Sequence, residues 1–389
     1  MRTEHGRVVA SLIRRLGDID LAEDAVGEAL VVALERWPAD GIPPNPGAWL
    51  TTTAGNKAID RIRREKRRQA KYAEAVMLVD DTPAPDEGPV EDDRLRLMFT
   101  CCHPALAPEN RVALTLRLLG GLTVAEIAKA FLVPETTMSQ RITRSKQKIR
   151  NANIPYRVPR AEDLPGRLGA VLTVLYLVFN EGYLASEGEG LRADLSNEAI
   201  RLTRQLTRLI DHPEATGLLA LMLLTEARRP ARLEDGALVM LDQQDRALWD
   251  PAMIDEGHRL VRECLATNRP GPYQIQAAIN AVHTDTLDAS MTDWSQIVQL
   301  YDQLLAIKPS PVAELNRAVA VAELDGAEVA LSIVDRLHLT TYHAWHVTRA
   351  ELLRRLDRRN EAADAYTRAW ELTDNAAERT HLERRRDDL

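Results

Sequence analysis

The sequence predicts an all-α protein with two or three domains. Its 389 residues exceed the usual size of one domain, and aromatic residues make up only 4% of them. The 45% apolar share is rich in alanine and leucine, which favour helices over sheets. Apolar residues recur at spacings of three and four, which is the period of one helix face. We therefore expect helices packed on helices, with each domain burying its own core.

Two packed helices are expected first. Apolar residues line one face of Glu4 to Leu16 and one face of Leu21 to Trp37, and the second face includes Leu34. Gly17 and Asp18 end the first helix and begin the second. The outward residues of the second helix are acidic: Glu23, Asp24, Glu28 and Glu35. Such an acidic face is most often a solvated helix surface.

A basic helix is expected from Gly47 to about Lys71, after a proline-containing loop. Between Lys57 and Lys71, eight lysines and arginines stand against two acidic residues. A strip of this charge binds phosphates but does not by itself read sequence. Trp49 and Ile59 fall on the apolar side of this helix, so we expect both to pack in the core. After it, Asp80 to Asp93 holds seven carboxylates and three prolines, which predicts a flexible acidic linker.

Residues 122–150 have the pattern of a helix-turn-helix. Thr123 and Glu126 form a capping-box start, and apolar residues follow at helical spacing. Pro134 interrupts this helix, and a second begins at Glu135. The inward face of the second helix is Met138, Ile142, Ser145 and Ile149. From Glu135 to Arg150, five basic residues oppose one acidic residue, which suits a DNA major groove, although a solvated basic helix has the same pattern.

These motifs resemble a known family. The run from Glu109 to Arg150 resembles region four of bacterial sigma factors, specifically the extracytoplasmic-function (ECF) class, which reads the minus-thirty-five promoter element. The string AWLTTTAGNKAIDRIRR, residues 48–64, resembles sigma regions two-three and two-four, which hold and open the minus-ten element. Residues 23–28 resemble the sigma helix that docks on the clamp helices of the largest polymerase subunits. The resemblance covers residues 5–150 and implies a promoter-specificity subunit of RNA polymerase.

The resemblance implies a role for each group of residues. Those expected to contact the upstream element are Thr137, Ser139, Gln140, Arg141, Arg144 and Lys146. Those expected at the minus-ten element are Asn45, Asn56, Asp60, Arg61, Arg63, Arg64 and Arg67. Those expected to bind core polymerase are Asp24, Glu28, Val31, Val32 and Glu35. The implied partners are core RNA polymerase and promoter DNA; no cofactor is implied.

The resemblance also divides the chain. It implies a helical sigma domain two over residues 1–71, an acidic linker over 72–93 and sigma domain four over 94–152. The Phe131 to Glu135 turn, with Cys101 to Pro104 ahead of it, is similar to a subgroup that carries a long helical C-terminal extension, here 160–389. Such an extension is expected to replace a separate anti-sigma factor as the regulator.

The extension contains an internal repeat. Val312 to Leu337 and Tyr342 to Leu372 each read as two helices, at an offset of 33 residues. This offset is close to the tetratricopeptide period, so we expect a tetratricopeptide-like domain, with repeats around 312–373, that binds a protein or peptide. A separate charged string surrounds Trp249, and Asp245 and Arg246 in it are expected either to pair with charges elsewhere in the fold or to contact a partner.

Other classes of protein fit less well. Cys101, Cys102 and His103 have no second pair of ligands nearby, so we expect the cysteines at a core position where a helix starts, not in a metal site. The three cysteines form no disulfide framework, no apolar run is long enough for a bilayer, and a cytoplasmic protein is expected. No catalytic motif marks an enzyme. The remaining alternative is a stand-alone helix-turn-helix regulator with a helical sensor.

Overall fold

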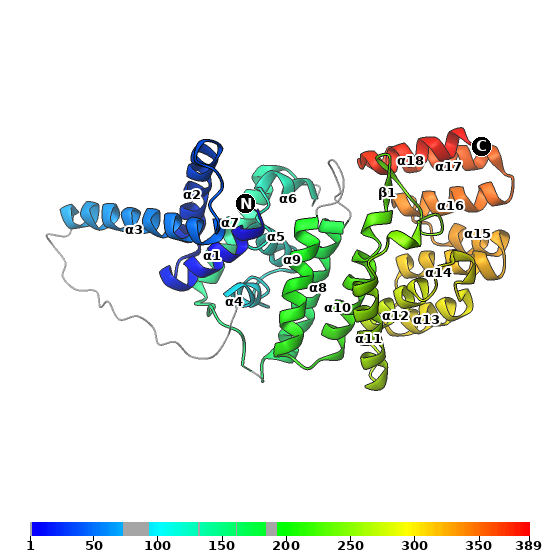
Figure 1. The fold of residues 1–389 in the computed structure, drawn as a ribbon, viewed down its shortest axis with the longest axis horizontal. Coiled ribbons are helices and arrows are strands. Elements are labelled where there is room, and N and C mark those ends of the chain that lie inside the picture. Colours follow the sequence, from blue (N-terminus) through cyan, green and yellow to red (C-terminus); the bar gives the residue numbers. More distant parts are fainter. Residues whose placement is uncertain (1, 73–92, 131–132, 161, 184–192) are drawn as a thin grey trace. The chain divides into compact units, whose positions relative to one another are not determined.

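The chain is almost entirely helical and divides into two compact units, Met1–Val178 and Phe179–Leu389 (Figure 1). The computed structural model describes residues 2–72, 93–130, 133–160, 162–183 and 193–389. The all-α prediction is confirmed. The acidic linker expected over 72–93 lies outside the described residues, apart from Tyr72 and Asp93 at its two ends. Within the described chain, no helix is both long and apolar enough to cross a membrane.

The first unit begins with a three-helix bundle. Its helices are α1 (Arg2–Leu16), α2 (Ile19–Asp40) and α3 (Pro46–Tyr72), and each packs against the other two. Asp18 caps α2 by accepting a hydrogen bond from the Leu21 amide at 2.9 Å. Figure 1 shows α3 extending beyond the two shorter helices, and this projecting part carries the basic strip.

Two inward assignments in this bundle were wrong. Leu34 is 63% exposed, because Ala33 and Trp37 occupy the inward side of α2 at that level. Ile59 is 37% exposed, because Ala58 takes the buried position on α3. Leu34 and Ile59 each directly follow a buried residue of their helix. Apolar character alone therefore did not identify the buried face.

The rest of the first unit holds the expected helix-turn-helix. Its helices are α4 (Asp93–Cys101), α5 (Pro108–Leu118), α6 (Val124–Ala130), α7 (Glu135–Asn151) and most of α8 (Leu164–Tyr183). The capping box forms: the Thr123 amide donates to Glu126 at 2.7 Å, and the Glu126 amide donates to the Thr123 hydroxyl at 3.2 Å. All four residues of the predicted inward face of α7 are buried. The two-helix motif is therefore built as its sequence pattern predicts.

The second unit is a succession of helices. They are α9 (Ala193–Leu209), α10 (Pro213–Glu226), α11 (Pro251–Ala266), α12 (Pro272–Thr284), α13 (Trp294–Ile307), α14 (Pro311–Leu324), α15 (Ala327–Arg336), α16 (His343–Arg355), α17 (Arg359–Leu372) and α18 (Ala376–Asp387). From α12 to α18, each helix packs on the next one along the chain. The residues of the predicted repeat fold as two helix pairs, α14 with α15 and α16 with α17. Their assignment to the tetratricopeptide class stays a prediction.

A short hairpin interrupts the helices and was not expected. Strands β1 (Leu233–Glu234) and β2 (Ala237–Leu238) pair in antiparallel register, Leu233 opposite Leu238. The two loop residues, Asp235 and Gly236, both have positive φ, 50° and 77°. An Asp-Gly pair is the sequence signal for such a two-residue turn, so this hairpin could have been predicted.

The charged string around Trp249 forms a buried clamp inside the second unit. Arg246 donates through Nη1 to the carbonyl oxygens of His283 (2.9 Å) and Thr286 (2.7 Å), at and just after the end of α12. Its guanidinium lies over the Trp249 ring, 4.9 Å from the centroid. Asp245 accepts a hydrogen bond from the Ala247 amide at 3.0 Å. These contacts lie within the fold, but the partners are backbone groups and the Trp249 ring where charged partners were expected, so the role of the string stays a prediction.

This clamp predicts a stability effect. Arg246→Met keeps the volume of the side chain but leaves the two carbonyl oxygens without their charged donor, so we expect the free energy of unfolding to fall by about 3 kcal/mol. The measurement is urea unfolding of the full chain followed by tryptophan fluorescence. Arg259→Met is the control, since Arg259 forms an exposed ion pair with Glu263 on α11, and should lose at most about 0.5 kcal/mol. Equal losses in the two variants would contradict the clamp.

Candidate nucleic-acid interface

Helix α7 presents only part of its predicted DNA-binding set to solvent. Ser139, Gln140 and Arg144 are exposed, and Thr137 and Arg141 are half-buried. The opposite face of α7 is packed in the core. This arrangement holds the exposed residues rigidly and leaves them accessible, as a helix that enters a groove requires.

The sixth residue of this set, Lys146, is held by the first bundle instead. Its side chain is only 13% exposed, and its ammonium group contacts Glu23 and lies 3.1 Å from Asp20, both on α2. Burial by itself lowers the pKa of Lys146, but the Glu23 and Asp20 carboxylates together raise it above its ordinary value. Lys146 is therefore charged and already paired with carboxylates in this structure.

Glu23 is the centre of a larger charge cluster. Its carboxylate also accepts a hydrogen bond from Arg117 Nε at 2.6 Å, and Arg150 pairs with Asp20 beside it. Only 10% of the Glu23 side chain is exposed. Burial raises the pKa of Glu23, but Lys146 and Arg117 together lower it by more than burial raises it. The net shift is therefore downward. We define this group as the Glu23 cluster: Asp20, Glu23, Arg117, Lys146 and Arg150.

Close packing accompanies these charges. A Cβ added at Gly6 would lie 2.4 Å from the carbonyl oxygen of Leu119, so α1 approaches the end of α5 as only glycine permits. The Tyr156 hydroxyl donates to the carbonyl oxygen of Ala10 at 2.8 Å. His5 is buried here beside Gly121. The helix-turn-helix and the first bundle are thus joined by both a packed and an ionic contact.

The acidic face of α2 is divided by these contacts. Glu23, placed on this face by its spacing, is turned into the cluster. Asp24 and Glu28 stay about half exposed and pair with the basic helix α3, Asp24 with Arg61 at 2.7 Å and Glu28 with Lys57 at 3.9 Å. Val31 is 54% exposed, Val32 is half-buried and Glu35 is exposed. Leu34 is exposed on the same part of α2. Its apolar character led us to place it in the core.

The residues expected at the minus-ten element gather along α3. Asn56, Asp60, Arg63 and Arg64 are exposed, and the side chain of Arg67 lies outside the described residues. Arg61 is half-buried and paired with Asp24. Asn45 caps α3, since its Oδ1 accepts a hydrogen bond from the Ala48 amide at 3.0 Å. Trp49 is half-buried against Trp37, with ring centroids 5.4 Å apart.

The adjacent cysteines are core residues at a helix end. Cys101 and Cys102 are fully buried, and Cys101 ends α4, whereas a helix start was expected. The pattern of apolar residues before them, Leu95 to Phe99, was the missed signal for α4. Burial raises the pKa of the Cys102 thiol to about 12, so it is protonated at neutral pH. Among the described residues, no three metal-ligating side chains form a cluster.

Comparisons with known proteins agree with these motifs. Residues 1–68 match the profile of sigma-70 region 2, residues 96–149 match that of sigma-70 region 4, and residues 167–265 match a family of unknown function, DUF6596. No solved structure matches the chain significantly.

Relatives with named functions match the sigma-factor part of the chain. An uncharacterised protein of Rhizobium meliloti (strain 1021) is 44% identical, across 98% of this chain and 93% of its own length. The ECF RNA polymerase sigma factor SigK of Mycobacterium ulcerans is 31% identical across 37% of this chain and 79% of its own length. SigK of Mycobacterium tuberculosis (strain H37Rv) is 28% identical over the same shares. The chain therefore belongs to the ECF family of RNA polymerase sigma factors and carries a long C-terminal extension.

Proposed function

We propose that the exposed side of α7 reads the upstream, minus-thirty-five element of the promoters that this sigma factor selects. The observation that carries this proposal is the rigid presentation of Ser139, Gln140 and Arg144 on a helix whose other face is buried. Thr137 and Arg141, which are half-buried, lie beside them on the same helix. Short polar side chains near the start of a recognition helix reach base edges, and basic ones reach phosphates.

The basic face of α3 would hold the opened minus-ten element. Asn56, Arg63 and Arg64 are exposed on this helix, and the strip from Lys57 to Lys71 carries an excess of six positive charges. Asp60 and Arg61 lie on the same helix, and Arg67 belongs to the same strip. The Asn45 side chain, which caps α3, would shape the preceding loop for an unstacked base.

The outer face of α2 would dock on the clamp helices of the largest core-polymerase subunit. Exposed acidic and exposed apolar residues lie together there: Asp24, Glu28, Val31, Leu34 and Glu35, with half-buried Val32 beside them. A monomer seldom leaves such apolar side chains grouped on a helix without a partner. The charged residues would orient the complex, and the apolar ones would supply buried area.

The contacts of the Glu23 cluster imply a closed form of the free chain. Lys146 lies on the DNA-reading helix and Glu23 on the polymerase-docking helix, so a DNA phosphate and Glu23 compete for the same ammonium group. Promoter binding through the C-terminal half of α7 then requires the cluster to open. Docking of α2 on polymerase would favour opening, since Asp24 directly follows Glu23.

The extension would regulate this process from within the cytoplasm in place of a separate inhibitor. Its helix pairs from α14 to α17 would bind a protein or peptide. Sigma factors act on transcription without catalysing a reaction of their own. The chemistry of nucleotide addition stays with the core enzyme.

Run-off transcription tests the proposed function as a whole. Purified bacterial core polymerase is combined with genomic DNA fragments and either the full chain or a chain truncated after Tyr183, the last residue of α8. Start sites that core polymerase does not use without this protein support promoter selection. A difference between transcripts obtained with the full chain and with the truncated chain supports regulation by the extension. Silence from both proteins, with tight duplex binding in the absence of polymerase, would instead indicate a stand-alone regulator.

A matched pair of glutamines tests the recognition helix. Gln140→Ala removes an exposed amide from the proposed base-reading part of α7, whereas Gln147→Ala removes one two turns later. We expect Gln140→Ala to weaken binding to the selected promoter by about 1–3 kcal/mol and Gln147→Ala to leave it unchanged. Competition binding of the holoenzyme to promoter duplexes measures both. Equal affinities for the two variants would rule out base reading by Gln140.

Neutralising Glu23 tests the closed form. Glu23→Gln leaves Lys146 and Arg117 without their shared carboxylate, so the two parts of the first unit should separate more easily. We expect the free chain to bind promoter duplex roughly tenfold more tightly, about 1.4 kcal/mol. Glu35→Gln removes the same charge from α2 at an exposed position outside the cluster and should change affinity little. The closed form is excluded if the two variants gain equally.

The buried histidine predicts a pH dependence of the same contact. Burial, and then Arg117, lower the pKa of His5 to about 4. The unfolded chain binds this proton below about pH 6.5 and the folded chain does not, so stability is full above pH 6.5 and falls toward pH 4. Between pH 7 and pH 5 the loss should be about 2 kcal/mol.

His5→Gln should remove that part of the pH dependence. Urea unfolding of both proteins at pH 7 and pH 5 measures it. His283, whose pKa burial also lowers to about 4, is present in both proteins and cancels in the comparison. If the free energy of unfolding depends on pH in the same way in His5→Gln, then the lowered pKa of His5 does not cause the loss of stability at low pH.

A further inference from the structure

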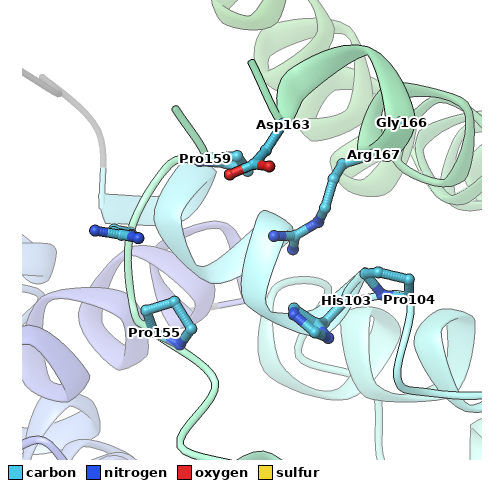
Figure 2. Close-up of a pocket in the computed structure, with 8 residues that line it drawn as sticks. His103, Pro104, Pro155, Pro159, Asp163, Gly166 and Arg167 are labelled. Carbon is cyan, nitrogen blue, oxygen red and sulfur yellow. The ribbon is translucent and has the colours of Figure 1, made fainter. Parts of the chain in front are cut away.

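A cavity lies where the chain leaves the helix-turn-helix and enters α8. Its volume is about 390 Å³, within the range of small-molecule sites. Prolines 104, 155 and 159 form part of its wall, and the polar groups that line it are His103, Arg157, Asp163 and Arg167. Figure 2 shows the Arg167 guanidinium between Asp163 and His103. None of these residues belongs to the surfaces assigned above to DNA or polymerase.

Arg167 is fixed at one side of the cavity. It donates through Nη2 to the carbonyl oxygen of Phe99, at the end of α4, and its guanidinium lies 5.9 Å from the centroid of the Phe99 ring. Among the described residues, no acceptor lies within hydrogen-bonding distance of its Nε. A guanidinium has five N–H donors, so Arg167 keeps donors for an anion.

His103 faces the same space with a defined donor. Its Nδ1 accepts a hydrogen bond from the Ala105 amide at 3.2 Å, so in the neutral ring the proton is on Nε2. Burial lowers the pKa of His103, and the nearby charges of Arg167 and then Arg111 lower it further. Arg111 is itself held in place by hydrogen bonds to the carbonyl oxygens of Leu106 and Pro104. The imidazole therefore stands in a positive field.

The positive charge here is not balanced by the chain. Two arginines line the cavity and Arg111 lies behind it, against one carboxylate, Asp163. In the described part of the chain, neither Arg157 nor Arg167 forms an ion pair, although the sequence carries a net charge of −8 and ion pairs hold many of its other arginines. A concave site lined by two guanidinium groups and only one carboxylate favours an anion with several acceptor oxygens.

We propose that this cavity binds a small phosphate-bearing anion through Arg157, Arg167 and the Nε2–H group of His103. A phosphoryl group presents acceptor oxygens in several directions and so can meet donors that approach from three segments of the chain. His103 follows α4, Arg157 lies in the connection after α7, and Arg167 lies on α8. The ligand would tie these segments together at the start of the extension and couple that junction to the concentration of a phosphorylated compound.

Isothermal titration of the full chain with pyrophosphate, and separately with inorganic phosphate, tests the site. Arg157→Gln is the informative variant, because Arg157 is exposed and its loss should not disturb folding. Arg160→Gln is the matched control, an exposed arginine of the same connection that does not line the cavity. We expect pyrophosphate affinity to fall at least tenfold in Arg157→Gln and to stay unchanged in Arg160→Gln. Equal losses in both variants, or no binding at millimolar pyrophosphate, would overturn the proposal.

Two further measurements separate this site from general charge effects. Bound anion should raise the pKa of His103. NMR of its ring protons measures this pKa, with His103→Gln used to assign the signals. An unchanged pKa would contradict direct contact.

Duplex DNA is then added as a competitor. Pyrophosphate that stays bound supports a free small molecule, whereas Arg157-dependent binding of duplex without pyrophosphate binding would assign the cavity to the DNA backbone and overturn the small-molecule proposal.

Discussion

The arrangement of the first unit depends on a carboxylate that is withdrawn from water. Glu23 has a side chain only 10% exposed and would be costly to bury alone, but Lys146 and Arg117 surround it. Removal of Glu23 takes away the carboxylate that Lys146 and Arg117 share, whereas removal of either cation leaves Glu23 with one partner in a poorly solvated position. The cluster joins α2 to α5 and α7, which are far apart in the sequence. Its energetic weight therefore lies in specifying one arrangement of these helices.

The same cluster gives the closed form a simple electrostatic logic. In the proposed closed form, phosphates of DNA and the carboxylate of Glu23 would be alternative partners for Lys146, so the protein's own acid would act as a substitute for DNA. Ser139 and Gln140, near the start of α7, take no part in the cluster and stay exposed. Under this proposal, a free sigma factor would keep its proposed base-reading groups accessible while lacking part of its phosphate contacts. It would then bind unrelated DNA weakly, since such binding depends mainly on phosphates.

Arginine has a different use in the extension. Arg246 is buried, with backbone carbonyl oxygens and the Trp249 ring as its partners, so its charge fastens helix ends and is not offered to a ligand. Arg157 and Arg167, at the entrance to the extension, have no such complete set of partners. A guanidinium group whose hydrogen-bond donors are met by the chain is a structural clamp. One that keeps unused donors is a candidate binding site.

The sequence by itself determined the all-α class, the helices of the first bundle, the helix-turn-helix and the family, but not α4 or the hairpin. The Thr123–Glu126 capping box, the inward face of α7 and the acidic and basic helices all follow from local spacing, because one helix turn brings residues three or four apart onto the same side. Local spacing could not place Leu34 or Ile59, since a residue on the border of an apolar stripe is buried or exposed according to what packs against it. It also could not pair Glu23 with Lys146, separated by 123 residues, or bring Arg157 and Arg167 to His103. Only the tertiary structure decided these pairings, because charges attract any opposite partner and the fold alone selects which one lies within reach.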